Sequence, residues 1–364
     1  MDTVRVAFDV GPLQGPRSGV GLSVAAMHEH LGARQDVSLI DYLVSFRAPR
    51  SALRRRLPFP AALAHRAWAL GERPRADRWL RGADVVHGTN YVVPPVSLPS
   101  VVTVHDCWFL QQPDALVAPS VRRAGQVLRR SLAAGAAVHA PSQATAAAVR
   151  DLFPGTPVTV VRWGALPLAA PPEVAPVPDL AGVRFVLAIG TLERRKNLPA
   201  LVRSFGRIAG DHPGLRLVLA GADGDDRPAI DAAVDELGSR ADQVLFVGRV
   251  ADEVRSWLLH HAAVVAYPSL DEGFGFPLLD AMQAEVPLVA SNAGAIPEVA
   301  GDAALLAAAS DVDALAGNLH SVLADATLAE RLVAAGRRRR NEFRWSECAD
   351  GLATMYHLLA EGSR

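Results

Sequence analysis

Short runs of β-branched and other apolar residues recur along the chain, and patterns typical of helices lie between them. The first part of the chain predicts strands at residues 4–9, 37–42, 85–87, 101–105 and 138–140. The later part predicts strands at residues 185–189, 216–220, 244–247, 263–267 and 287–291. Strands that alternate with helices are typical of parallel sheets with helical crossover connections. The pattern therefore predicts an α/β fold with two doubly wound, Rossmann-like parallel sheets.

A proline-rich stretch at residues 166–182 separates the two sets of strands and predicts an interdomain linker. We therefore expect an N-terminal Rossmann-like domain at residues 1–165 and a C-terminal Rossmann-like domain at residues 183–344. Residues 345–364 predict a helix that returns to the first domain. We expect the two domains to face each other across a cleft, with ligands bound beyond the carboxyl ends of the strands.

Size and composition narrow the class of protein. The chain has 364 residues, half of them apolar, which is enough for two domains. It has no long uncharged apolar run and no basic-then-apolar start, so we expect a cytoplasmic protein. The net charge of −1 argues against nucleic acid as a partner. Two cysteines, Cys107 and Cys348, are too few for a disulfide framework or a thiolate metal site.

One local charge asymmetry runs from Arg47 to Arg81, where arginines outnumber Glu72 and Asp77. We favour the interpretation of a solvated helical face. The alternative is a surface for anionic membrane lipid or for an anionic acceptor, which would place the protein at the inner face of the membrane. Apolar residues in and near this stretch would help such a surface to bind: Leu53, Leu57, Phe59, Leu63 and Trp68.

The segment YPSLDEGFGFPLLD at residues 267–280 sets two carboxylates, Glu272 and Asp280, on either side of a glycine-rich bend. Pro277 suits the first turn of a helix, which places Glu272 in a loop and Asp280 in the opening turn. In a continuous helix this spacing would be about 12 Å, about the span of an activated sugar from ribose to hexose. The bend can shorten it. The segment predicts a ligand-binding site.

A basic turn, GTLERRKNL at residues 190–198, follows the predicted strand 185–189. Three adjacent cations, Arg194, Arg195 and Lys196, would repel one another and oppose a helix dipole unless an anion lay nearby. Arginine can bind two phosphate oxygens in parallel, and lysine supplies a compact charge. The turn therefore predicts a diphosphate clamp that needs no metal, with a solvated basic turn as the alternative.

Two loops of the first part add candidate residues. The glycine-rich turn from Gly11 precedes a helix that we expect to begin near Leu22 or Ser23, so the amides of Gly19 and Gly21 could face an anion. A plain tight turn is an equally good interpretation. At the end of strand 101–105, His105 could donate to a sugar hydroxyl or phosphate, and Asp106 could orient it. A hydrogen-bonded structural histidine is the alternative.

Together these motifs resemble the retaining glycosyltransferases of family 4, which have the GT-B fold of two facing Rossmann-like domains. The resemblance covers nearly the whole chain and is most specific in its C-terminal half. It rests there on the basic turn, FVGRV at 246–250, the segment 267–282 and SNAGAIPE at 291–298. The N-terminal half adds SGVG at 18–21, HGTNYVVPP at 87–95, TVHD at 103–106 and PSQAT at 141–145. These sequence motifs are most similar to those of bacterial mannosyl- and rhamnosyltransferases of surface polysaccharide and glycoconjugate synthesis.

The resemblance implies transfer of a hexosyl group, with retained anomeric configuration, from a nucleotide-diphosphate sugar (GDP-mannose-like, UDP- or dTDP-linked). The implied acceptor is the hydroxyl of a carbohydrate, a lipid-linked or a small molecule, and no metal or other cofactor is implied. The implied catalytic residues are His105 near the donor sugar, Arg195 and Lys196 on the diphosphate, and Glu272 on the transferred sugar. The implied donor-binding residues are Gly19, Gly21, Gly190, Val250, Gly273, Phe274, Gly275, Phe276, Pro277, Leu278 and Asp280, the last on the ribose hydroxyls.

The chain departs from the family pattern at three points. The second carboxylate of the family is Glu, whereas Asp280 is one methylene shorter. Thr191 stands where some members have Arg, and Arg162-Trp163-Gly164 stands where many have Pro-Asn-Gly. Other functions stay open: a glycoside hydrolase with the two carboxylates as acid and base, a nucleotide-sugar epimerase on the same fold, or a non-catalytic nucleotide-sugar binding protein.

Overall fold

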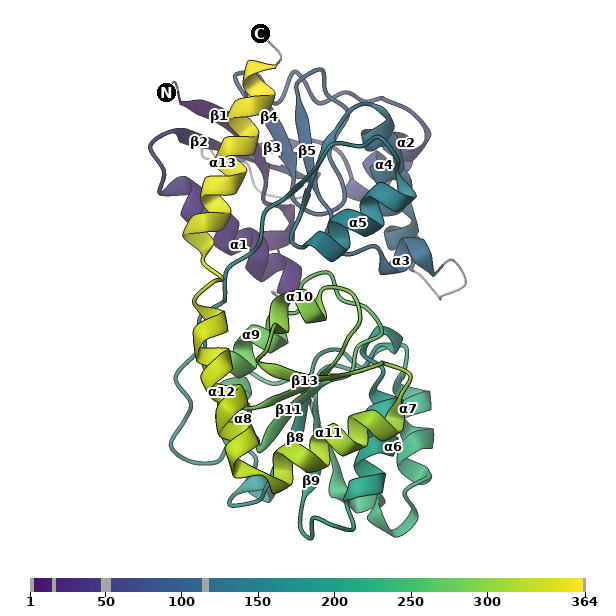
Figure 1. Cartoon of the computed structure of the whole chain (residues 1–364). Coiled ribbons are helices and arrows are strands. Elements are labelled where there is room, and N and C mark those ends of the chain that lie inside the picture. The colour runs from purple at the N-terminus through teal and green to yellow at the C-terminus, as the bar shows by residue number, and fades with distance from the viewer. Residues whose placement is uncertain (1–2, 15–17, 47–53, 113–117, 363–364) are drawn as a thin grey trace. The chain divides into compact units, whose positions relative to one another are not determined.

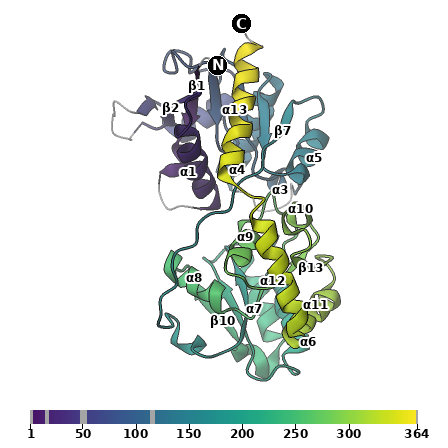
Figure 2. The ribbon, with the colours of Figure 1, turned by 60° about the vertical axis from the view of Figure 1, so that its left-hand side comes forward.

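The computed structural model describes residues 3–14, 18–46, 54–112 and 118–362. The chain divides into two compact units, shown in Figures 1 and 2. Unit 1 comprises Met1–Gly164 and Phe343–Arg364, and unit 2 comprises Ala165–Glu342. Each unit has a single parallel sheet in its described part, with helices as the crossover connections. The predicted α/β class with two doubly wound sheets is confirmed.

The described part of unit 1 has a seven-stranded sheet in the order β3-β2-β1-β4-β5-β6-β7. Its strands are β1 (Val4–Asp9), β2 (Val37–Val44), β3 (Arg54–Leu57), β4 (Val85–Gly88), β5 (Ser100–Thr103), β6 (Ala137–Ala140) and β7 (Val158–Val160). Its helices are α1 (Gly19–Gly32), α2 (Ala61–Leu70), α3 (Trp108–Gln111), α4 (Pro119–Ala133), α5 (Gln143–Leu152) and α13 (Trp345–Glu361), with a 3₁₀ turn η1 (Gly11–Leu13).

Unit 2 has a six-stranded sheet in the order β10-β9-β8-β11-β12-β13 among its described residues. Its strands are β8 (Phe185–Ile189), β9 (Arg216–Ala220), β10 (Val244–Gly248), β11 (Val264–Tyr267), β12 (Leu288–Ser291) and β13 (Ala304–Ala307). Its helices are α6 (Leu198–Ile208), α7 (Arg227–Asp235), α8 (Asp252–His261), α9 (Phe276–Gln283), α10 (Ile296–Ala300), α11 (Val312–Ala324) and α12 (Ala326–Arg340). The 3₁₀ turns are η2 (Pro178–Leu180), η3 (Arg194–Lys196) and η4 (Gly238–Gln243).

Each predicted strand coincides with an observed one, within a residue or two at its ends. Three observed strands, β3, β7 and β13, were not predicted, and all three lie at sheet edges. Central strands such as β11 are buried on both faces and therefore have the continuous apolar sequence that identifies them. The strand predicted at 101–105 ends earlier, at Thr103, so His105 lies in the loop that follows β5.

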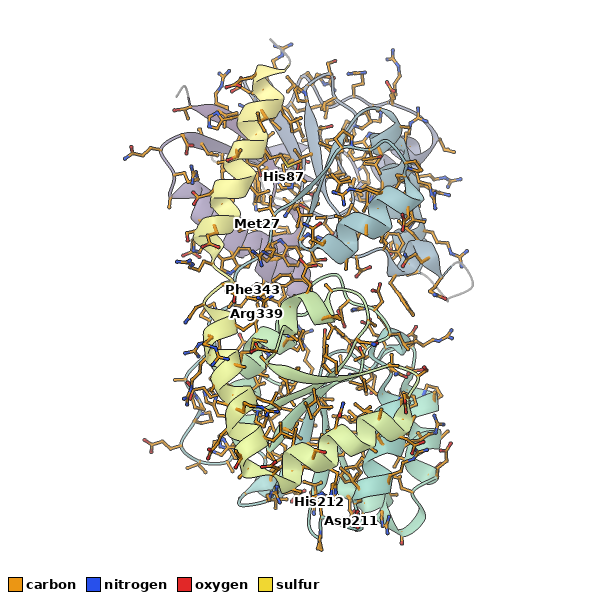
Figure 3. All side chains as sticks on the ribbon, in the orientation of Figure 1. Met27, His87, Asp211, His212, Arg339 and Phe343 are labelled. Atoms are coloured by element: carbon orange, nitrogen blue, oxygen red, sulfur yellow. The ribbon has the colours of Figure 1, made fainter. Side chains whose placement is uncertain are left out.

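The C-terminal helix α13 belongs to unit 1, where it packs on α1, β1 and β4. The yellow ribbon of α13 runs beside α1 in Figure 1. The Tyr356 hydroxyl of α13 lies 2.6 Å from Nδ1 of His87 on β4, a buried residue labelled in Figure 3. This hydrogen bond ties the end of the chain to the middle of the sheet.

The proline-rich stretch at 166–182 lies in unit 2 and is hydrogen-bonded to its helices. Gln283 Nε2 donates to the Leu166 carbonyl at 2.8 Å, and Ser256 Oγ donates to the Ala169 carbonyl at 2.5 Å. The segment therefore follows the surface of unit 2 through backbone contacts.

The basic stretch is not a single helical face, so the favoured interpretation of that segment is wrong. Arg47, Arg50 and Leu53 lie outside the described residues, and the arginines at 54–56 belong to the edge strand β3. Leu57 and Trp68 are fully buried in the core rather than presented on a surface. Membrane contact through this stretch stays a prediction. None of the helices in the described ranges is long and apolar enough to cross a membrane.

Candidate functional site

In the sheet of unit 2, the direction in which successive strands are added reverses between β8 and β11. From β8 the chain moves outward to β9 and β10, and from β11 it moves outward the other way to β12 and β13. The loops after β8 and β11 leave the sheet on opposite sides, and ligands of doubly wound sheets bind in the crevice between such loops. The two loops carry Arg195, Lys196 and Glu272. The topology therefore brings three of the predicted catalytic residues together.

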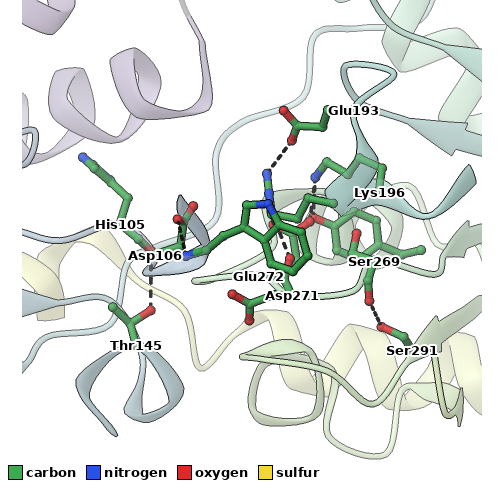
Figure 4. Close-up of polar contacts among 12 residues, drawn as sticks. His105, Asp106, Thr145, Glu193, Lys196, Ser269, Asp271, Glu272 and Ser291 are labelled. Atoms are coloured by element: carbon green, nitrogen blue, oxygen red, sulfur yellow. Dashed lines mark hydrogen bonds and ion pairs between the residues drawn. The ribbon is translucent and has the colours of Figure 1, made fainter. Parts of the chain in front are cut away.

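Glu272 is the centre of this cluster (Figure 4). Lys196 Nζ lies 2.6 Å from Glu272 Oε1 and donates to the Tyr267 hydroxyl at 3.1 Å. The Arg195 guanidinium forms an ion pair with the other carboxylate oxygen of Glu272. Arg195 also donates to Glu193 Oε1 at 2.7 Å and to the Asp271 carbonyl at 3.1 Å. Both cations thus converge on one carboxylate.

The electrostatics of the cluster keep this carboxylate ionised. Burial alone would raise the pKa of Glu272, but the charges of Lys196 and Arg195 lower it to about 2. The carboxylate is the nearby anion that the basic turn requires. It also holds the Arg195 guanidinium and the Lys196 ammonium group in fixed positions, so little reorganisation is needed when they bind a ligand anion.

The basic turn differs from the prediction in its local structure. Arg194, Arg195 and Lys196 form the separate 3₁₀ turn η3, and α6 begins only at Leu198. Asn197 lies between them in the left-handed conformation, with φ of 53°. Its side-chain amide donates to the carbonyls of Pro268 and Ala309 at 3.1 and 2.8 Å. Asn197 therefore fixes the loop after β8 against the loop after β11.

The glycine-rich bend forms as predicted. Gly275 has φ of 98° and caps α9, and Pro277 lies in the first turn of that helix. The segment from Glu272 to Asp280 is therefore not a continuous helix, so the 12 Å spacing of a full helix does not apply. The amides of Gly273 and Gly275 belong to buried residues in the bend.

Asp280 lies in α9 with a side chain that is only 2% exposed. It forms an ion pair with Arg255 of α8. Burial raises the pKa of Asp280, and Arg255 partly opposes the rise. Its Oδ1 is buried and has no hydrogen-bond partner among the described residues. Its contact with ribose hydroxyls stays a prediction.

The other predicted donor-binding residues of unit 2 differ in accessibility. Gly190 directly follows β8, and an added Cβ there would lie 3.2 Å from Lys196 Cε. Phe274 is buried against Phe276, with ring centroids 5.3 Å apart. The side chain of Leu278 is fully buried, so it supports α9 from the core side. Val250 is half-buried in the loop after the edge strand β10, two strands away from β8.

The glycine turn of unit 1 was partly mispredicted. Helix α1 begins at Gly19 rather than near Leu22 or Ser23, because Ser18 acts as its N-cap. The Ser18 hydroxyl accepts a hydrogen bond from the Gly21 amide at 3.4 Å. The Gly21 amide predicted to face an anion is thus engaged within the chain, whereas Gly19 is exposed in the first turn. Residues 15–17 of this turn lie outside the described residues.

His105 is buried and is oriented by a backbone carbonyl. Its Nε2 lies 2.9 Å from the Thr89 carbonyl, and its Nδ1 has no hydrogen-bond partner among the described residues. Burial lowers the pKa of His105 to about 3, although the bond to Thr89 opposes this. The ring is therefore neutral, with the proton on Nε2 and a lone pair on Nδ1. The prediction that Asp106 orients this ring is wrong, and the free nitrogen accepts rather than donates.

Three features of the site were missed from the sequence. Tyr267 ends β11 and contacts Lys196, and Gly294 lies so close to Glu272 that an added Cβ would be 2.5 Å from the Glu272 carbonyl oxygen. Lys196 is the only lysine in a chain with 37 lysine and arginine residues. That singularity is a signal the sequence offers. Lysine at this one position, where every other basic residue of this type is arginine, indicates a need for a compact charge.

Groups of three or more His, Cys, Asp or Glu side chains that could hold a metal ion do not occur in the described ranges. The side chains of Cys107 and Cys348 are both buried.

Two family models match the chain. One, described as glycosyl transferases group 1, matches residues 178–339, and the other, described as glycosyltransferase family 4, matches residues 17–165. The first match contains the Lys196 and Glu272 cluster, and the second contains His105.

Curated relatives and solved structures also match this chain. O-antigen chain mannosyltransferase B of Escherichia coli is 29% identical across 98% of this chain and 100% of its own length. Glycogen synthase of Mycobacterium tuberculosis is 34% identical across 59% of this chain and 52% of its own length. The structure of sucrose-phosphate synthase from Thermosynechococcus elongatus matches with a TM-score of 0.73 and 20% identity, covering 99% of both chains. This last match concerns the fold alone.

Proposed function

We propose that this chain, which belongs to glycosyltransferase family 4 and has the GT-B fold, transfers a hexosyl group from a nucleotide-diphosphate sugar to an acceptor hydroxyl. The observation that carries the proposal is the cluster at the switch point of unit 2, where Arg195 and Lys196 converge on buried Glu272. A paired guanidinium and ammonium group at this place suits a diphosphate.

The proposed chemistry breaks the bond between the sugar C1 and the diphosphate oxygen and forms a bond between C1 and the acceptor oxygen. Negative charge grows on the diphosphate as the first bond breaks, so fixed positive charges on Arg195 and Lys196 favour the transition state over the ground state. The acceptor proton passes to the departing phosphate oxygen on the same face of the sugar. The products are a nucleoside diphosphate and a glycoside with retained configuration, and the scheme requires no metal.

Two carboxylates complete the proposed donor site of unit 2. Glu272, ionised and held by two cations, would accept hydrogen bonds from hydroxyls of the transferred sugar; its ionised carboxylate supports this role. The role of His105 in unit 1 stays a prediction from the sequence; the free Nδ1 of its neutral ring can accept a hydrogen bond from a hydroxyl. A ribose hydroxyl would satisfy the unpartnered Oδ1 of Asp280.

We further propose mannose as the first sugar to test, because the relative that spans the whole chain is named a mannosyltransferase of the O-antigen chain. The acceptor would then be a carbohydrate of a surface polysaccharide. A cytoplasmic location and peripheral membrane contact remain predictions from the sequence.

A donor screen tests the proposal. Melting temperatures are measured with GDP-, UDP- and dTDP-sugars, and the donors that raise the melting temperature are then incubated with an acceptor panel. Transfer of the sugar supports the proposal. A donor that binds and is converted alone into another sugar nucleotide would indicate an epimerase, and binding without any turnover would indicate a binding protein. No shift with any nucleotide sugar would refute the donor site itself.

A further inference from the structure

Unit 1 contains a cavity of about 530 Å³ at the amino-terminal end of β5, the end away from His105. Its wall comes from α2, α4, the loop that precedes β5 and Leu359 of α13. Pockets that bind small molecules typically have volumes of about 300–1,000 Å³. None of the residues predicted to bind the sugar donor lines this cavity, so it is separate from the site described above.

Arg130, in the last turn of α4, contributes a half-buried cation to the wall. Its Nε is buried and has no hydrogen-bond partner in the described part of the chain. A buried donor left without a partner is unfavourable, and more so if it is charged. Arg75, the other arginine of the wall, lies 3.0 Å from Asp77 and 3.4 Å from Glu72. The positive charge available to a ligand is therefore that of Arg130.

Part of the remaining wall is apolar, and polar side chains such as Ser97 and Ser131 lie between the apolar ones. Val96, Leu98 and Leu359 are half-buried and offer apolar surface to a ligand, whereas Trp68 is fully buried. Val93 and Val127 are almost fully buried beside it. A ligand that matches this wall has one anionic group and an apolar body.

The loop that precedes β5 is held in place by its prolines and by backbone hydrogen bonds from neighbouring segments. Pro94, Pro95 and Pro99 restrict its backbone. The Pro95 and Pro99 carbonyls each accept a backbone hydrogen bond at 2.9 Å, from Ala76 and Val86. A wall that is already ordered loses little conformational entropy when a ligand binds.

We propose that this cavity binds a small amphipathic oxyanion, with its phosphate or carboxylate oxygens on Arg130 and its apolar body against Leu98 and Leu359. Arginine suits such a group because its planar guanidinium can donate two parallel hydrogen bonds to oxygen atoms. The same chemistry could come from a free small molecule or from the headgroup and first methylenes of an anionic lipid. The proposal does not depend on the transferase activity.

Calorimetric titration of the full chain with octyl phosphate tests the proposal, with octanol and inorganic phosphate as partial ligands. We expect saturable binding of one octyl phosphate per chain, and at least tenfold weaker binding of either partial ligand. Arg130→Gln should weaken octyl phosphate binding tenfold or more, because it removes a charge-assisted hydrogen bond. Ala134→Leu, which adds a side chain at the cavity wall, should also weaken it.

Arg129→Gln is the matched control. It removes the same charge from the adjacent position of α4, where the guanidinium lies over the Phe153 ring at 5.3 Å. It should leave the affinity for octyl phosphate unchanged. Melting temperatures of all variants verify that each is folded.

Several results would overturn the proposal: no binding of octyl phosphate, equal binding of octanol or inorganic phosphate, equal effects of the Arg130 and Arg129 variants, or binding that survives both cavity variants. Sedimentation with vesicles of phosphatidylcholine and phosphatidylglycerol identifies the source. Vesicle binding that is lost in Arg130→Gln assigns the cavity to a lipid headgroup. Binding of octyl phosphate without vesicle binding assigns it to a free molecule.

Discussion

Lys196→Ala removes the one ammonium group of the proposed diphosphate clamp. In the folded chain that group lies 2.6 Å from Glu272 Oε1 and 3.1 Å from the Tyr267 hydroxyl, and its side chain is 12% exposed. Loss of one preorganised donor to a developing negative charge costs about 3–4 kcal/mol in the transition state, or a factor of about 10²–10³ in kcat. We therefore expect kcat to fall at least 100-fold.

The same substitution also lowers the stability of the fold, but this loss of stability reduces activity much less. In Lys196→Ala, Glu272 still forms its ion pair with Arg195, so its buried carboxylate keeps a counter-charge. We expect the free energy of unfolding to fall by about 1–3 kcal/mol. Proteins are typically stable by about 5–15 kcal/mol. Even at the low end of that range, about 2 kcal/mol remains and more than about nine-tenths of the chains stay folded. Unfolding therefore cannot account for a 100-fold loss.

The assay compares initial rates of sugar transfer with melting curves for the wild type, Lys196→Ala and Arg194→Ala. Arg194 belongs to the same 3₁₀ turn and has an exposed side chain, so its removal changes the local charge equally without touching Glu272. We expect Arg194→Ala to keep most of the activity. A fall in rate that merely follows the folded fraction, or equal losses in the two variants, would refute the role given to Lys196.

Three further predictions concern neighbouring residues. Asp280→Asn should raise the donor KM about tenfold with little change in kcat, because a neutral amide oxygen accepts a weaker hydrogen bond from a ribose hydroxyl than a carboxylate does; an unchanged KM would remove Asp280 from the ribose site. Gly294→Val should abolish transfer and lower the melting temperature, because its Cβ would collide with the Glu272 backbone; normal kinetics would refute the close packing. Burial lowers the pKa of His139 to about 4, so the neutral ring stabilises the fold fully above pH 6.5 and this stability, up to about 3 kcal/mol, is lost as the pH falls to 4. His139→Leu should flatten the fall in denaturation midpoint between pH 6.5 and 4, and an unaltered pH profile would contradict this assignment.

The sequence predicted the central strands well because a strand covered on both faces is continuously apolar. The edge strands escaped notice for the opposite reason. β3 consists mainly of arginines and β13 reads Ala-Leu-Leu-Ala, which suits a helix equally well. Their strand conformation comes from pairing with β2 and β12, and such tertiary pairing leaves little trace in local sequence.

The candidate site shows the same limit. The residue types at 195 and 196 indicated an anion-binding site and the segment with Glu272 a ligand-binding bend, and the strand order explains why they meet. Their mutual ion pairs could not be predicted, because side chains from loops more than 70 residues apart converge only in the fold. The partner of His105 was mispredicted for a related reason. A backbone carbonyl, that of Thr89, has no signature in the sequence.

Because Lys196 is the only lysine, an amine-reactive reagent measures its accessibility directly. The chain is treated with trinitrobenzenesulfonate in the presence and absence of GDP-, UDP- and dTDP-sugars, and modification at Lys196 is followed by peptide mass spectrometry. If Lys196 binds the donor diphosphate, at least one nucleotide sugar will slow its modification tenfold or more and leave the rate at the α-amino group unchanged. Equal rates at Lys196 with every nucleotide sugar, at concentrations that raise the melting temperature, would contradict the proposed donor site.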